Sequence, residues 1–255
     1  MMEPEAGTAV GEPQRYFFVH LQKTGGTALY QRLRDQFGVD AVYPTPADQG
    51  SPRAVIDTDF LAQRFSAHRD RLRVITGHFP LCTADLLGVP FSTFTVLRDP
   101  VDRTLSFLRH QRMIEDRFAA SELEEIYAER GLHDLVDNHM VKMLSLTTDE
   151  MTAGTMTPMT FDRSRLDTAK HNLAERIDVF GLQEHFDEFC GEIAARFAWN
   201  LGRPRFANRT PALDASADLR ARIADDNRYD VELYRFAADL WEERSRRRHH
   251  GARAT

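Results

Sequence analysis

Short apolar runs alternate with longer amphipathic segments along most of this chain. The apolar runs have the length and composition of buried strands, and they cover residues 15–21, 73–76, 91–97 and 178–182. Between them, apolar residues recur three or four positions apart, which predicts helices over residues 27–37, 59–69, 100–112, 163–176 and 184–197. This alternation predicts an α/β fold with a mostly parallel central sheet flanked by helices and with ligands at the carboxyl ends of the strands.

One strand-to-helix junction carries clear local signals. The predicted strand over residues 91–97 ends in Arg98. Asp99 has the side chain of an N-cap, and Pro100 suits the first position of the helix that follows. Asp99 and Arg103 are four residues apart, which we interpret as a cap and a surface pair that support the helix.

The remaining segments are less regular. The prolines and the glycine of residues 44–53 predict a loop, and the pattern over 121–146 is mostly helical. Residues 147–160 form a polar surface loop, and the last helices are expected between residues 215 and 243. We expect a flexible amino-terminal tail over residues 1–14, a single domain over 15–245 and a flexible basic tail over 246–255.

The composition limits the possible partners. The 255 residues carry a formal net charge of -6, whereas a protein that binds nucleic acid or an anionic membrane over a wide face needs a basic surface. The two cysteines, Cys82 and Cys190, are too few for a disulfide framework and wrongly spaced for a zinc site. Residues 1–15 lack the features of a signal peptide, and no stretch approaches the roughly 18 apolar residues of a membrane span. These features predict a cytoplasmic protein that binds no nucleic acid and leave its oligomeric state open.

The stretch FFVHLQKTGGTALYQRL, residues 17–33, places a lysine and two glycines between a predicted strand and a predicted helix. Backbone N–H groups of a glycine-containing turn at a helix N-terminus point outward together, so such a loop suits phosphate or a similar anion. Lys23 precedes the glycines, which does not fit the pattern G-x-x-x-x-G-K-[ST] and disfavours an ATPase or GTPase. The alternative is a tight strand-to-helix connection without a ligand.

Several segments together resemble one family. HLQKTGGTAL at 20–29 and TVLRDPVDRTLSFLRH at 95–110 look like the two cofactor-binding motifs of the sulfotransferases that use 3′-phosphoadenosine 5′-phosphosulfate (PAPS). The chain most resembles the carbohydrate branch that contains the heparan sulfate 2-O- and 6-O-sulfotransferases. Further similar segments are TGHFP at 76–80, DNHMVKMLS at 137–145, FGLQEHFDEF at 180–189 and YDVELYRFA at 229–237. The resemblance leaves out residues 44–72 and 147–177, and it implies a P-loop-like three-layer fold.

The resemblance also implies a PAPS site. The implied cofactor-binding residues are Lys23, Thr24, Gly25, Gly26, Thr27, Ala28, Arg98 and Ser106. Backbone N–H groups from Gly25 to Ala28 and the two threonine hydroxyls would hold the 5′-phosphate, while Arg98 and Ser106 would hold the 3′-phosphate. Lys23 would meet the charge that builds on the departing phosphate oxygen, by analogy with phosphoryl transfer. Ala28 replaces the usual serine or threonine, so one hydroxyl contact is missing. No metal is required, and the sequence offers no acidic cluster for Mg²⁺.

An acceptor hydroxyl must lose its proton as it attacks, and histidine is the side chain best suited to take it near neutral pH. His78 follows a predicted strand end and a glycine, and the resemblance assigns the general base to the corresponding histidine. The alternative for His78 is a capping or loop residue. We interpret His20, inside the strand, as a core histidine that can orient the loop.

Acceptor recognition is less well defined by the sequence. Basic residues available either to an acceptor or to solvent are Arg109, His110, Arg112, His139 and Lys142. The acidic net charge favours a small glycan, glycolipid or metabolite over a long polyanionic glycan. The sequence thus predicts a PAPS-dependent O-sulfotransferase that acts on a hydroxylated acceptor. The alternatives are a catalytically inactive nucleotide-binding module, for which Ala28 is the hint, and a kinase-like enzyme, which the position of Lys23 disfavours.

Overall fold

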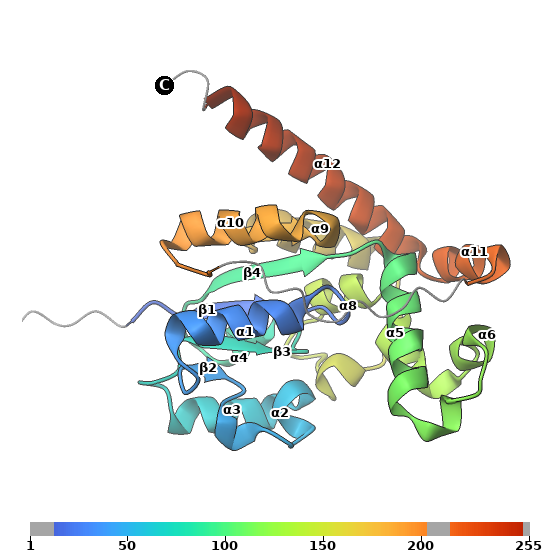
Figure 1. Cartoon of the computed structure of the whole chain (residues 1–255), viewed down its shortest axis with the longest axis horizontal. Helices are drawn as coiled ribbons and strands as arrows, with labels where there is room; N and C mark the ends of the chain where they lie inside the picture. The colour runs from blue at the N-terminus through green and yellow to red at the C-terminus, as the bar shows by residue number, and fades with distance from the viewer. Residues whose placement is uncertain (1–12, 203–214, 252–255) are drawn as a thin grey trace, which may run out of the picture.

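A five-stranded parallel sheet forms the centre of the protein in the computed structural model, which describes residues 13–202 and 215–251 (Figure 1). The strands are β1 (Tyr16–Val19), β2 (Val42–Tyr43), β3 (Val74–Gly77), β4 (Ser92–Leu97) and β5 (Val179–Leu182). They lie in the order β2-β3-β1-β4-β5, and each neighbouring pair is parallel. The expected α/β fold with a parallel sheet is therefore confirmed.

Helices cover both faces of this sheet. They are α1 (Gly26–Phe37), α2 (Arg53–Ile56), α3 (Thr58–Ala67), α4 (Thr83–Leu86), α5 (Pro100–Ile114), α6 (Leu123–Tyr127), α7 (His133–Val136), α8 (His139–Ser145), α9 (Arg163–Glu175), α10 (Phe186–Phe197), α11 (Ala217–Asp226) and α12 (Arg228–Gly251). Within the described ranges, no helix is both long and apolar enough to cross a membrane.

Aromatic contacts show how alternate residues of β1 meet the two layers. The Tyr16 ring lies 5.6 Å from Phe37 of α1 and 5.1 Å from Phe197 of α10. Phe17 points to the opposite face, as the period of a strand requires. There its ring lies 6.1 Å from Phe91, which in turn lies 6.0 Å from Phe65 of α3.

A second, smaller core forms beyond the carboxyl end of the sheet, where β4 leads into α5 (Figure 1). The α5 residues Leu105 and Leu108 pack there with Ile126, Val136 and Ile223 from α6, α7 and α11. The start of α5 agrees with the sequence: Pro100 is its first residue, and the Asp99 side chain accepts a hydrogen bond of 2.9 Å from the Asp102 N–H.

Some predicted elements differ from the structure. The helical pattern over 121–146 is divided into α6, α7 and α8, and Asn138 interrupts it with a left-handed backbone (φ 40°), a conformation that asparagine adopts more readily than most residues. The short elements β2, α2 and α4 were not predicted.

The carboxyl-terminal prediction was wrong about helix length. We expected the last helix to end near residue 243, but α12 continues to Gly251, through part of the range 246–255 that we expected to be a flexible tail. Two contacts support the extension as far as residue 247, because Arg244 lies over the Phe180 ring and Arg247 pairs with Glu243 one turn before it. Residues 1–12 of the expected amino-terminal tail and residues 252–255 lie outside the described ranges.

The start of α12 fixes α8 through a buried carboxylate. The Asp230 side chain accepts hydrogen bonds from the N–H groups of Met140 (3.0 Å) and Val141 (2.8 Å), which have no partner within α8 itself. The His139 ring of α8 in turn lies 3.5 Å from the Gln22 N–H in the loop after β1. The carboxyl-terminal helix is thus connected through α8 to that loop.

Candidate functional site

The loop that joins β1 to α1 combines two left-handed residues. Lys23 has φ 68° and Gly25 has φ 95°. Glycine adopts this conformation freely, whereas for lysine it costs about 1–2 kcal/mol. The loop lies at the carboxyl end of β1, between the ends of β3 and β4, which pair with β1 on its two sides.

The loop presents backbone N–H groups at the start of α1. In the described part of the chain, the N–H groups of Gly25, Gly26 and Thr27 have no hydrogen-bond partner. They lie at the positive end of the helix dipole, so they can bind an anion.

Two expectations about the loop need correction. The Ala28 N–H donates to the Gly25 carbonyl at 3.1 Å, so it belongs to the first turn of α1 and is not free for a phosphate. The buried Thr24 hydroxyl donates to the Leu21 carbonyl at 2.8 Å, so its proton stabilises the loop. The Thr27 hydroxyl is on an exposed residue and remains available at the helix start.

Gly26 is required by the ring of His20. A Cβ atom at position 26 would lie 1.8 Å from the His20 Nε2 atom, much closer than any non-bonded contact allows. The ring cannot easily move, because it is stacked on Phe18 with 5.1 Å between the ring centroids. His20 therefore shapes the loop, in agreement with the orienting role predicted for it.

Lys23 and Arg98 place two positive charges together. Arg98 follows β4, and its Nη1 atom donates to the Lys23 carbonyl at 3.0 Å. Within the described residues neither side chain forms an ion pair. Burial and the charge of Arg98 lower the pKa of Lys23 from its ordinary value. The two cations are thus held beside the free N–H groups of the loop.

The helix α5 contributes two further polar residues. Ser106 is buried, and His110 lies one turn later on the same face. Burial and the nearby charge of Lys23 lower the pKa of His110. The sequence analysis listed His110 among the basic residues available either to an acceptor or to solvent. Its spacing of four residues from Ser106 on the same helix is the feature that could have placed it at the site.

His78 lies directly after β3 and is fixed in one tautomer. Its Nδ1 atom lies 3.2 Å from the His20 carbonyl oxygen, and its backbone N–H donates to the Val55 carbonyl at 2.7 Å. A carbonyl oxygen only accepts, so Nδ1 carries the proton and Nε2 is left as a hydrogen-bond acceptor. Burial, and to a lesser extent the charge of Lys23, lower the pKa of His78 despite the opposing hydrogen bond. The imidazole is therefore neutral near pH 7.

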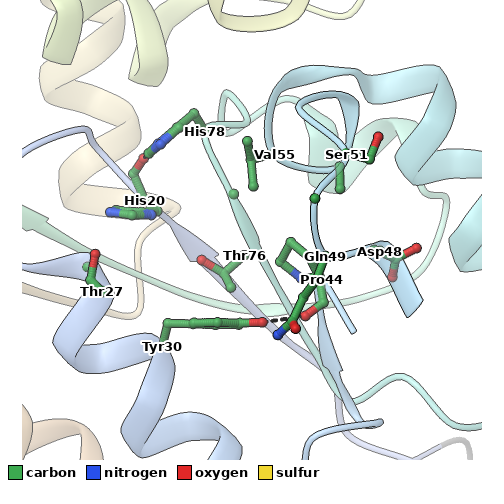
Figure 2. A pocket seen from close by; sticks show the side chains of 14 residues that line it. His20, Thr27, Tyr30, Pro44, Asp48, Gln49, Ser51, Val55, Thr76 and His78 are labelled. Atoms are coloured by element: carbon green, nitrogen blue, oxygen red, sulfur yellow. Dashed lines mark hydrogen bonds between the residues drawn. The ribbon is translucent and has the colours of Figure 1, made fainter. Parts of the chain in front are cut away.

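A pocket of about 320 Å³ opens beside the loop. Its walls come from the start of α1, from the segment 44–55 and from the end of β3 with His78 (Figure 2). Figure 2 shows Thr76 between the histidine pair and the Tyr30 ring, whose hydroxyl donates to the Pro44 carbonyl at 2.5 Å. Sequence reasoning missed this pocket, because the whole of the segment 44–55 falls in the stretch 44–72, which has no recognisable motif.

Three basic residues that the sequence analysis assigned to a surface pair or made available to an acceptor or solvent are buried. Arg103 is fully buried, and its Nη2 atom donates to the Val136 carbonyl at 2.9 Å. Lys142 is 1% exposed, and its ammonium group donates to the Asp134 carbonyl at 2.7 Å. His139 is also buried. The interpretation of Arg103 as part of a surface pair was wrong, and His139 and Lys142 do not form a solvated face.

No protein-family model and no curated protein matches the chain. A sulfotransferase from Alicyclobacillus acidocaldarius has a similar structure, with 13% sequence identity and a TM-score of 0.48 over 87% of this chain and 94% of that one. A similarity of this degree assigns neither family nor activity, so the roles of the residues rest on the geometry of this chain. Within the described residues, no group of three or more His, Cys, Asp and Glu side chains is placed to hold a metal ion.

The close packing of His20 on Gly26 predicts the effect of one methyl group. Gly26→Ala should lower the free energy of unfolding by about 1–3 kcal/mol, the usual cost of overpacking, and should weaken anion binding at the loop. Gly191→Ala is the matched control, because position 191 is exposed in α10 with nothing within 4 Å of a new Cβ atom. That control should be neutral or stabilising by up to about 1 kcal/mol. Urea unfolding measures the free energy of unfolding of both variants. Equal stability of the two would contradict the close packing of His20 on Gly26.

Proposed function

We propose that the protein is a PAPS-dependent O-sulfotransferase that acts in the cytoplasm on a carbohydrate, glycolipid or other small hydroxylated acceptor. One observation carries this proposal: unpartnered backbone N–H groups and two unpaired cations surround one loop, and a histidine with a free acceptor nitrogen lies beside it. Such a loop binds an anionic nucleotide, and the histidine can take a proton from a hydroxyl group.

The residues present fit the phosphates of such a donor. The N–H groups of Gly25, Gly26 and Thr27 would hold the 5′-phosphate, together with the Thr27 hydroxyl. Arg98 has guanidinium donors beyond the one that reaches Lys23, and it would hold the 3′-phosphate with Ser106. When bound, PAPS supplies an activated sulfuryl group attached to a phosphate oxygen.

The catalytic roles fall to Lys23 and His78. The acceptor oxygen would form a bond to sulfur while the bond between sulfur and the phosphate oxygen breaks, and the departing phosphate would keep that electron pair. Lys23 would stabilise the charge that grows on this oxygen, an interaction that is stronger in the transition state than in the ground state. His78 Nε2 would take the acceptor proton, because its tautomer leaves this nitrogen free.

A transfer experiment tests the proposed function. Adenosine 3′,5′-bisphosphate should raise the melting temperature more than ATP with Mg²⁺ does, because the site is assigned to a nucleotide with a 3′-phosphate. Radiolabel should then pass from PAPS to a hydroxyl acceptor. A nucleotide-binding module without catalysis would show the thermal shift without transfer, and a kinase-like enzyme would respond to ATP with Mg²⁺ instead.

The assignment of Arg98 predicts a selective loss of affinity. Arg98→Ala should weaken binding of adenosine 3′,5′-bisphosphate by about 2–5 kcal/mol, since a charged partner is truncated, and should weaken binding of adenosine 5′-phosphate much less. Arg71→Ala, at an exposed position before β3, is the matched control and should change neither affinity. Calorimetric titration measures both nucleotides. Equal losses of affinity for the two nucleotides would show that Arg98 does not bind the 3′-phosphate.

The assignment of His78 predicts a change in rate and in pH dependence. His78→Asn should lower kcat by roughly 10² to 10⁴ and leave nucleotide affinity nearly intact. Only the neutral imidazole accepts a proton and the pKa of His78 is lowered from 6.5, so the wild-type rate should rise with pH below 6.5 and level off near neutrality. This rise should be absent in the variant.

His171→Asn, exposed on α9, serves as the control and should keep the wild-type profile. A His78→Asn variant that transfers at the wild-type rate with an unchanged profile would make His78 structural. His20 would then be tested next as the base.

A further inference from the structure

The walls of the pocket beside His78 combine apolar surface with neutral hydrogen-bonding groups. Pro44, Ala54, Val55 and the Tyr30 ring supply the apolar part. Thr27, Gln49, Ser51 and Thr76 supply hydroxyl and amide groups. This is the usual composition of a small-molecule site, and about 320 Å³ lies at the lower end of the roughly 300–1,000 Å³ range of such sites. The pocket therefore has room for one small molecule or one terminal unit of a larger one.

Thr76 provides an independent sign that a polar ligand belongs there. The residue is 3% exposed, and its hydroxyl oxygen has no hydrogen-bond partner among the described residues. A buried polar group without a partner costs about 1–3 kcal/mol. Thr76 lines the pocket, between the histidine pair and Tyr30 (Figure 2). A hydroxyl group on a ligand can satisfy this oxygen.

The pocket carries no unpaired charge. None of the residues that line it is a lysine or an arginine, and its one carboxylate belongs to Asp48. That carboxylate pairs with Arg64 of α3 at 2.6 Å and accepts a hydrogen bond from the Thr45 hydroxyl at 2.7 Å. An anionic acceptor would lose its hydration here without gaining a cationic partner, which is unfavourable. The cations Lys23, in the loop, and Arg98, after β4, are assigned to the nucleotide.

From these observations we propose that the acceptor is a small, uncharged hydroxylated compound bound in the pocket between α1, the segment 44–55 and the end of β3. This inference rests on the proposed function and adds the acceptor class to it. It agrees with the expectation from the net charge that a small acceptor is favoured over a long polyanionic glycan, and it adds that the acceptor carries no charge. The pocket is lined by Gly26 and Thr27 at the start of α1 and also by His78. An acceptor bound there would therefore place its hydroxyl group next to the proposed base.

Two matched pairs of ligands test the charge preference. 4-Nitrophenyl β-D-glucoside and the corresponding glucuronide differ by a carboxylate, and so do 4-ethylphenol and 4-hydroxyphenylacetate. Binding should be measured by calorimetry with and without saturating adenosine 3′,5′-bisphosphate, and transfer from PAPS in parallel. The uncharged member of at least one pair should bind at least tenfold more tightly than its anionic partner.

Two substitutions connect this preference to the pocket. Thr76→Val keeps the shape and removes the hydroxyl, so it should weaken binding of the uncharged ligand about 2- to 10-fold without lowering the melting temperature. Gln49→Lys adds a cation at an exposed position of the pocket lining. It should lower the ratio of the affinity for the uncharged ligand to that for the anionic ligand at least threefold. Gln49→Met is the control of similar length without a charge, and it should retain the wild-type preference.

The possible outcomes separate this inference from the proposed function. Equal or tighter binding of both anionic ligands, or no binding of any of the four, overturns the acceptor class even if sulfuryl transfer to another compound is found. Selective binding of an uncharged ligand that depends on Thr76 supports the pocket assignment, even where the nucleotide fails to bind and the sulfotransferase proposal falls. Unchanged selectivity in Gln49→Lys would place the ligand outside the pocket and overturn the inference.

Discussion

The contact between Gly26 and the ring of His20 determines much of the geometry of the site. The ring occupies the space of a side chain at position 26, and it is held there by stacking on Phe18. The start of α1 is therefore packed directly against the end of β1, which positions its free N–H groups over the strand end. The carbonyl of the same His20 accepts from His78 and thereby fixes the tautomer of the proposed base. One residue thus links the proposed anion-binding loop to the proposed proton acceptor.

The electrostatics of the loop favour a bound anion over the free state. Lys23 and Arg98 are both half-buried; burial and the charge of Arg98 lower the pKa of Lys23, and burial, together with a smaller effect of the charge of Arg109, lowers the pKa of Arg98. An anion beside them would offset the effect of Arg98 on Lys23, and binding would raise the pKa of Lys23 back toward its ordinary value. A protein with a net charge of -6 can therefore place two cations beside one loop without a basic surface.

The sequence predicted the elements that depend on local signals. Asp99 and Pro100 specify the start of α5 by capping and by a fixed φ angle, and the apolar runs specify four of the strands. The two-residue strand β2 and the four-residue helices α2 and α4 are too short to show a period. Lys142 and Arg103 looked like surface residues because charge usually means exposure, yet carbonyl oxygens of Asp134 and Val136 bind them in the interior. The pattern of hydrophobic and polar residues does not indicate these partners, and only the tertiary structure reveals them.

The order of the strands explains why the proposed donor and acceptor sites lie on different sides of β1. β1 lies in the middle of the sheet, with β3 and β2 on one side and β4 and β5 on the other, so the loop after β1 lies where the chain connections diverge. The β4 side contributes Arg98 and α5, whereas the β3 side contributes Thr76, His78 and the neutral walls of the pocket. The segment 44–55 belongs only to the second side, and the Tyr30 hydroxyl connects it to α1. Changes in that segment can therefore alter the pocket while the cationic loop and its N–H groups stay in place.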